Sequence, residues 1–171
     1  GIYAEKGMLM GELRGHRSGI REIQGGEASN VVCKKVTLKV DNGSFEEEKF
    51  MSYLKQHNIG FEIVKEDLTQ ITVYGTAAHA STPDLGVNAI SHALEALFHA
   101  GFNDPFTDWF HRYFALSVHG EILGYEKLKD DIPDTSINFG VARKDGDDVV
   151  ISLDMRFPVR TGKRISSRSE E

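Results

Sequence analysis

The sequence has little cysteine, no excess of basic charge and no long apolar run. Its single cysteine, Cys33, cannot form a disulfide within the chain, so nothing indicates an oxidising compartment. The 26 acidic residues outnumber the 20 basic ones, which argues against a nucleic-acid partner, because such binders present a basic face. No apolar run approaches the ~20 residues of a membrane-spanning helix, so we expect no membrane partner and a cytoplasmic location.

The first residues of the chain also lack two common features. They carry neither the basic end nor the apolar stretch of a signal peptide, and there is no initiator methionine. We therefore expect a piece cut from a longer polypeptide. Its 171 residues, 40% of them hydrophobic, are enough for one domain with a core, or for two small halves.

The hydrophobic pattern predicts more strands than helices. Period-two alternation and turn residues favour strands over 8–13, 19–24, 31–40, 61–65, 69–74, 137–142 and 149–157, the last two joined by an Asp-Gly turn at 145–146. Helices are expected over 45–57 behind a Ser44–Glu47 capping box, over 87–100, and from Pro105 onward, with an irregular connection over 120–133. Neighbouring strands look hairpin-like, so we predict an α+β fold: a mostly antiparallel sheet with helices on one face.

The stretch 74–88 is the most informative part of the chain. A β-like run ends at Gly75, three small residues follow, and His79 arrives with almost no bulk around it. Thr82, Pro83 and Asp84 then have the chemistry of a helix start. The pattern predicts an imidazole at a strand-to-helix turn that another molecule can approach closely; the plain alternative is a loop histidine with no task.

One further group has a simple explanation, and two others each allow two interpretations. The acidic run 46–48 fits the first turn of a helix, where the dipole alone accounts for it. His92, Glu95 and His99 share one helix face, so a metal site is conceivable, although exposed polar residues explain the spacing as well. The aromatic residues of 106–114 form either a core seam or a surface for a partner.

Four motifs carry a resemblance to a known family. The segment 75–89 reads Gly-x-x-x-His-Ala-Ser-x-Pro-x-x-Gly-x-Asn-Ala; the others are Gly-Gly-Glu-Ala-Ser-Asn-Val-Val at 25–32, Ser-Ile-Asn-Phe-Gly at 136–140 and Leu-Asp-Met-Arg-Phe-Pro at 153–158. In their order along the chain they resemble the lid-domain signatures of the dinuclear zinc peptidases that include aminoacylase, carboxypeptidase G and carnosinase. The bacterial beta-Ala-Xaa dipeptidase type is the most similar.

The resemblance implies a lid domain over 1–160, built as two linked ferredoxin-like halves with a seam near 61–70, and a polar tail over 161–171 that is disordered or added by cloning. The metal half of the family supplies a His-x-Asp motif and a Glu-Glu pair in a glycine-bearing context. This chain has no His-x-Asp, and its Glu-Glu pairs lack that context. The resemblance thus implies two zinc ions in the full-length enzyme, none bound by this chain, and a catalytic domain that lies outside it.

Three residues receive roles from the resemblance. His79 would reach over the zinc site and donate a hydrogen bond to the scissile carbonyl oxygen. Asn138 would hydrogen-bond the substrate backbone, unless it is ordinary strand-edge polarity. Arg156 would clamp the free carboxylate of the substrate, since a guanidinium binds carboxylates bidentately; the alternative is an ion pair with Asp154 or another acid of the sheet.

Two functions therefore stay open. The first is the substrate-binding lid domain of a cytoplasmic zinc dipeptidase that hydrolyses short peptides with a free C-terminal carboxylate. Its partners would be the missing catalytic domain, the dipeptide and a second copy in a homodimer, and the chain alone would be inactive. The second is a non-catalytic α+β module for binding or oligomerisation.

Overall fold

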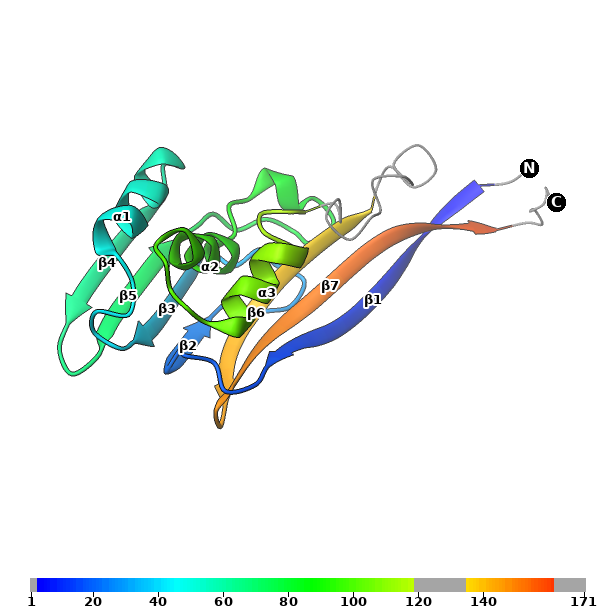
Figure 1. The fold of residues 1–171 in the computed structure, drawn as a ribbon. Coiled ribbons are helices and arrows are strands. Elements are labelled where there is room, and N and C mark those ends of the chain that lie inside the picture. The colour runs from blue at the N-terminus through cyan, green and yellow to red at the C-terminus, as the bar shows by residue number, and fades with distance from the viewer. Residues whose placement is uncertain (1–2, 119–134, 162–171) are drawn as a thin grey trace.

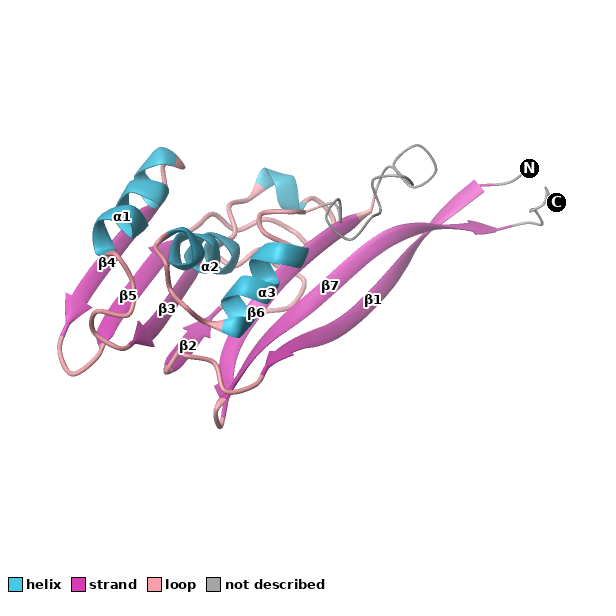
Figure 2. Ribbon diagram, in the orientation of Figure 1, coloured by secondary structure: helices cyan, strands magenta, loops and turns pink. Residues whose placement is uncertain are grey.

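The computed structural model describes residues 3–118 and 135–161, which form one antiparallel sheet covered by helices (Figure 1). Seven strands follow the spatial order β1-β7-β6-β2-β3-β5-β4. The helices lie together on one face of this sheet, as the colouring by secondary structure makes plain (Figure 2). The predicted α+β class is confirmed. No helix within the described ranges is long and apolar enough to span a bilayer.

The strands are joined mainly as antiparallel neighbours. Their bounds are β1 Tyr3–Gly15, β2 Glu22–Gly25, β3 Lys35–Val40, β4 Gly60–Lys65, β5 Thr69–Tyr74, β6 Ser136–Asp145 and β7 Asp148–Thr161. The β6–β7 hairpin turns at 146–147, where Gly146 has a φ of 60°. Such a φ strains most residues but not glycine, which explains the Asp-Gly pair that predicted this turn.

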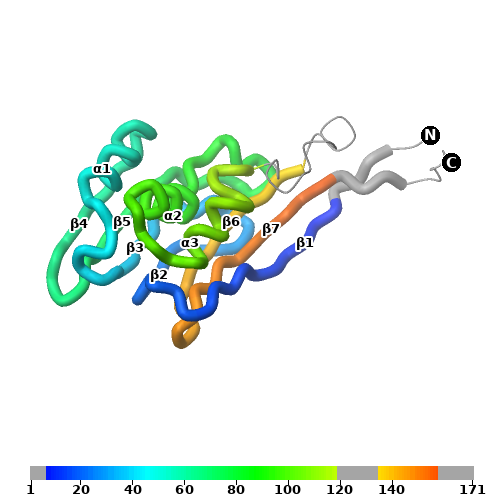
Figure 3. Tube along the Cα trace, in the orientation of Figure 1, coloured from blue at the N-terminus to red at the C-terminus, as the bar shows by residue number. Residues whose placement is uncertain are grey.

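The sheet extends on one side into a long two-stranded ribbon. β1 and β7 pair over their whole lengths, from Tyr3 opposite Thr161 to Gly15 opposite Val149. β6 begins only at Ser136, opposite Arg156, so beyond Arg156 strand β7 is paired with β1 alone. The tube in Figure 3 follows these two strands as they run out side by side from the rest of the fold.

The helices are α1 Glu47–Gln56, α2 Ala89–His99 and α3 Pro105–Tyr113, with a short 3₁₀ turn, η1, over Pro83–Leu85. Two carry strong N-caps: the Asn88 carboxamide accepts from the amides of Ile90 and Ser91, and the Asp104 carboxylate accepts from the Thr107 amide. These bonds satisfy amide donors that the first helical turn leaves unpaired.

The core lies between the helices and the sheet. Phe110 and Phe114 pack edge-on against Phe139 of β6, each with 5.0 Å between ring centroids. The core-seam interpretation of the aromatic segment is therefore confirmed for its buried rings. Trp109 and Tyr113, on the other side of α3, remain partly exposed.

Two predicted helix starts are wrong. Glu46, not Ser44, occupies the N-cap of α1 and makes no side-chain cap, because the Ser44 hydroxyl donates instead to the Asp41 carbonyl at 2.7 Å. Thr82 makes no cap bond either: it precedes only the 3₁₀ turn, and the long helix starts afresh at Asn88.

The structure does not test three predictions: the division into two halves, the irregular connection and the polar tail. The seam expected near 61–70 coincides with the β4–β5 hairpin, whose strands belong to the same sheet as the rest, and the division into two halves stays a prediction. The whole connection over 120–133 and all but the first residue of the tail over 161–171 lie outside the described residues.

Candidate functional site

The loop that carries His79 is held by backbone hydrogen bonds to the segment 30–34. The Val32 amide donates to the Ala78 carbonyl at 2.7 Å, and the Ala80 amide donates to the Asn30 carbonyl at 2.8 Å. Val31 and His79 form an isolated antiparallel bridge between these bonds. The predicted loop is thus a short extension of strand pairing, which fixes the backbone of His79 on both sides.

Glycines permit this close packing of backbones. A Cβ atom at Gly75 would lie 2.0 Å from the Val87 carbonyl oxygen, and one at Gly26 would lie 1.8 Å from that of Gly140. Neither position can hold a larger residue without moving the backbone opposite. The glycines of the sequence motifs therefore have a packing reason, independent of any role in chemistry.

The imidazole of His79 is exposed, and its own loop orients it. Nδ1 accepts a hydrogen bond from the Ser81 amide at 3.0 Å and lies 2.6 Å from the Ser81 hydroxyl. A backbone amide can only donate, so Nδ1 is the acceptor and the neutral ring carries its proton on Nε2. The ring therefore presents an N–H donor on the side away from Ser81.

Asn138 is only 1% exposed, and its side chain is fully engaged. Its amide nitrogen donates to the carbonyls of Ser29 and Val31, at 3.1 and 3.0 Å, and its oxygen lies 3.5 Å from the Asn88 amide nitrogen. Asn138 thus joins β6 to the segment that pairs with the His79 loop, and both of its amide hydrogens are already used.

Arg156 makes the ion pair that was its alternative interpretation. Its Nε and Nη2 atoms donate to the two carboxylate oxygens of Asp154, at 3.0 and 3.3 Å, and that carboxylate is fully buried. The pair is bidentate, which holds the guanidinium plane in one orientation.

Pairing across β6 and β7 brings two of the three predicted residues, Asn138 and Arg156, to one region. Ser136 lies opposite Arg156 and Asn138 lies opposite Asp154, and residues opposite or two apart share a sheet face. The Ser136 hydroxyl donates to the Ala80 carbonyl at 3.1 Å, directly after His79. The backbone directly after His79 is therefore tied to the face that carries the Arg156 guanidinium, a group suited to binding an anionic ligand.

A second cluster combines predicted residues with one that the sequence did not reveal. Glu95 is 3% exposed, so the expectation that His92, Glu95 and His99 form an exposed polar face is wrong for Glu95. Helix α3 crosses α2 and places His111 Nδ1 2.9 Å from a Glu95 carboxylate oxygen. His111 follows Glu95 by 16 positions, so only packing brings the two together.

The described residues do not fit the dinuclear zinc site that the resemblance implies. Within them, Glu95, His99 and His111 are the only group of three or more potential ligands close enough to share an ion. A two-metal site needs a bridging ligand and ligands for both ions, and three residues do not provide them. The acidic run 46–48 offers no alternative, because Glu46 and Glu47 pair with Lys49 and Lys65.

Comparison with known proteins finds similarity to peptidases. Residues 69–145 match the family model of the peptidase dimerisation domain. A Staphylococcus haemolyticus protein named "Putative dipeptidase" is 28% identical over 130 residues, which are 72% of this chain and 28% of that protein. A namesake from Staphylococcus aureus is 27% identical over 144 residues, 80% of this chain and 31% of its own length.

The chain spans less than a third of the length of these curated relatives. The matched region runs from β5 through α2 and α3 to the end of β6, and it includes His79, Asn138 and the Glu95 cluster. Over these residues the chain is similar to peptidase dimerisation domains.

Proposed function

We propose that this chain is the substrate-binding lid domain of a zinc-dependent dipeptidase, and that it acts only with a catalytic domain encoded elsewhere in a longer polypeptide. The observation that carries the proposal is the His79 loop, where Ser81 occupies Nδ1 of the exposed ring and leaves Nε2–H as a donor. The similarity to proteins named as dipeptidases supports the same substrate class. Within it, we favour the beta-Ala-Xaa type, on the motif resemblance alone.

His79 would stabilise the transition state of peptide-bond hydrolysis. Its Nε2–H would donate to the scissile carbonyl oxygen as negative charge develops there. One such preorganised donor contributes typically about 3–4 kcal/mol, equivalent to roughly 10²–10³ in kcat. Because Ser81 fixes the ring before substrate arrives, the donor needs little rearrangement at the moment of reaction.

Arg156 would bind the C-terminal carboxylate of the peptide. A guanidinium has five N–H donors, and Asp154 engages the Nε and Nη2 atoms, so a substrate would approach through the Nη1 side. Asn138 would act chiefly by holding 29–31 beside the His79 loop. A direct contact with the substrate would require it to exchange one of its two carbonyl partners for the peptide.

The remaining parts of the enzyme would come from outside the chain. Two zinc ions and their ligands would belong to the catalytic domain, and the β1–β7 ribbon is placed to join the lid to it. Closure of the lid would bring His79 and Arg156 onto the substrate together, which would couple chemistry to domain motion. We also propose a homodimer and a cytoplasmic location.

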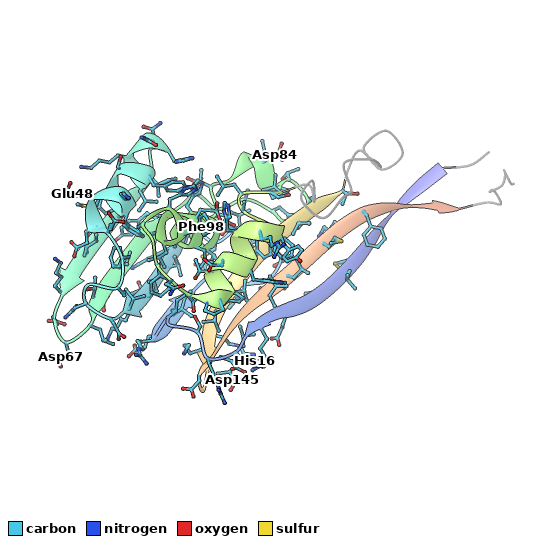
Figure 4. All side chains as sticks on the ribbon, viewed as in Figure 1. His16, Glu48, Asp67, Asp84, Phe98 and Asp145 are labelled. Carbon is cyan, nitrogen blue, oxygen red and sulfur yellow. The ribbon has the colours of Figure 1, made fainter. Side chains whose placement is uncertain are left out.

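The test is His79→Ala in the full-length enzyme, assayed with zinc or manganese on dipeptides with a free carboxylate. We expect kcat to fall roughly 10²–10³-fold with unchanged thermal unfolding, because the ring is exposed. The matched control is His16→Ala, another exposed histidine, labelled in Figure 4, whose Nδ1 lies 3.1 Å from an Asp148 carboxylate oxygen. An unchanged kcat in His79→Ala would remove the proposed role.

A non-catalytic binding or oligomerisation module is the second candidate. It is favoured by one observation: Asn138 and Arg156 both have partners within the chain. The reading frame around this segment separates the two functions. Flanks that encode His-x-Asp and a glycine-bearing Glu-Glu support the peptidase, and flanks that encode neither support the module.

A further inference from the structure

Two helices converge on a buried carboxylate that does not belong to the His79 site. Glu95 lies in the middle of α2, with His99 one turn further along the same helix and His111 on the facing side of α3. One ligand atom from each of the three residues lies within 4.8 Å of the other two. Figure 4 shows this helical layer, with Phe98 labelled on α2.

The separations are close to those of a metal site. Glu95 Oε1 lies 2.9 Å from His111 Nδ1 and 3.9 Å from His99 Nε2. Bonds of about 2.0–2.1 Å from zinc to imidazole nitrogen and carboxylate oxygen, at tetrahedral angles, put ligand atoms roughly 3.3 Å apart. A small rotation of His99, whose side chain is 48% exposed, would close the set.

The imidazoles are held in place by neighbouring rings. His111 stacks on Phe98 with 3.7 Å between centroids and 11° between planes. His99 stacks on Tyr53 of α1 at 5.0 Å and 17°. Imidazoles held by stacking lose little conformational entropy when a metal binds. This favours metal affinity, as hydrogen bonds from neighbouring residues to the ligands do.

The electrostatics favour a cation at this position. A carboxylate as buried as Glu95 is costly unless a positive group or a metal accompanies it. In the described structure its polar partners are the two histidines. Burial and the negative charge of Glu95 raise the pKa of the Tyr53 hydroxyl, so Tyr53 does not compete as an anion.

We propose that Glu95, His99 and His111 bind one divalent transition-metal ion, with zinc preferred. Two imidazoles and one carboxylate suit zinc rather than magnesium or calcium, which prefer oxygen ligands. A surface hollow beside Glu95 and His99, lined also by Ser52 and Gln56, leaves room for a water as the fourth ligand. The ion would fasten α2 to α3, and it is separate from the zinc pair of the proposed peptidase.

The test uses the metal-free 171-residue chain and zinc chloride alone. Calorimetry should give one zinc per chain, and zinc should raise the unfolding temperature. Cobalt(II) should give the visible absorption of a four-coordinate site with nitrogen and oxygen ligands. His99→Ala should weaken the zinc Kd at least about 10-fold, and since His99 is half-exposed, the fold should persist by circular dichroism.

His16→Ala is the matched control, because His16 is also exposed and pairs with an acid, Asp148, but has no second histidine beside it. It should bind zinc like the unchanged chain. Glu95→Gln, which keeps the side-chain shape, should weaken binding as much as His99→Ala does. Equal zinc affinity in His99→Ala and the unchanged chain, or no zinc-dependent rise in unfolding temperature, would overturn the proposal, whatever the fate of the peptidase assignment.

Discussion

The proton on His79 is assigned by a neighbour only two residues away. The Ser81 amide donates to Nδ1 and cannot reverse its role, whereas the Ser81 hydroxyl can adapt to either direction. A histidine that must present an N–H needs its other nitrogen occupied by a donor. The His-x-Ser spacing supplies that donor within the loop.

We therefore expect neutral His79 to exist as the Nε2–H tautomer. Long-range ¹H–¹⁵N correlation spectra at a pH above the titration of the ring would show a pyrrole-type shift at Nε2 and a pyridine-type shift at Nδ1. His16 in the same spectra serves as an internal comparison, because no backbone amide donates to its ring among the described contacts. Protonation at Nδ1 of His79 would contradict the prediction.

Cys33 should be unreactive in the folded protein. Its thiol is 2% exposed and donates to the Lys35 carbonyl at 3.2 Å. Burial raises the pKa of the thiol, so both access and thiolate fraction are reduced. A thiol-reactive dye should label the native chain far more slowly than the chain in denaturant, and fast labelling of the native chain would indicate that the segment 30–34 opens readily.

At the scale of elements, α3 depends on one buried carboxylate. Asp104 accepts from the Thr107 amide at 3.1 Å and from the Thr107 hydroxyl at 2.8 Å, and it also accepts from Ser18 and the Gly19 amide. It therefore caps the helix and ties its start to the loop between β1 and β2. Four hydrogen bonds on one fully buried side chain make it a strong constraint on where α3 lies.

Replacing Asp104 by Ala should destabilise the fold by about 2–4 kcal/mol, since a helix cap alone is worth about 1 kcal/mol and buried donors lose their partners as well. Urea unfolding of the 171-residue chain measures the change. Asp108→Ala is the matched control: this acid is exposed in the same first turn and should cost less than about 1 kcal/mol. Equal losses of unfolding free energy in Asp104→Ala and Asp108→Ala would indicate that the Asp104 hydrogen bonds do not stabilise the fold.

Sequence patterns located the elements better than their ends. Alternation predicts β5 to the residue and the other strands within a few positions, and it is clearest in β3, where every second residue is buried. The helix starts were less predictable, since several residues near each start can cap it. Ser44 found a carbonyl acceptor in its own turn, and Asn88, inside the expected helix, made the cap.

The packing of the whole molecule determines the hydrogen-bond partners of each side chain, which a local sequence pattern does not predict. The exposure of His79 was predictable from the small residues around it. The partners of Asn138 come from a segment more than 100 positions away, and those of Glu95 come from the crossing of two helices. Asn138 and Arg156 thus lie close together on the sheet, but the sequence alone does not reveal that both are already paired.

The stability of the whole domain should fall in mild acid. Burial, together with the neighbouring His57, lowers the pKa of His92 to about 4 from 6.5, and none of the residues in 3–118 and 135–161 offers the buried Nδ1 of His92 a hydrogen bond. The unfolded chain therefore binds this proton more readily than the folded chain, so stability is greatest above pH 6.5 and is lost as pH falls toward 4.

Urea unfolding midpoints measured from pH 7 to pH 4 test this dependence. Asp41 and Asp148, whose pKa values are lowered by Arg21 and Arg14 respectively, lose their contribution only below the usual carboxyl range, so they disturb this window little. His92→Gln should flatten the slope, and the exposed His16→Ala should leave it unchanged. An identical slope in His92→Gln would assign the effect to other groups.

The pairing of Tyr3 with Thr161 has a consequence for protein engineering. Because the first and last described residues of the ribbon are paired, the fold can be attached to another protein at a single point. A host protein could receive the whole fold as a cassette spliced into one surface hairpin, and the chain could be circularly permuted by linking these positions and reopening it at the β4–β5 turn.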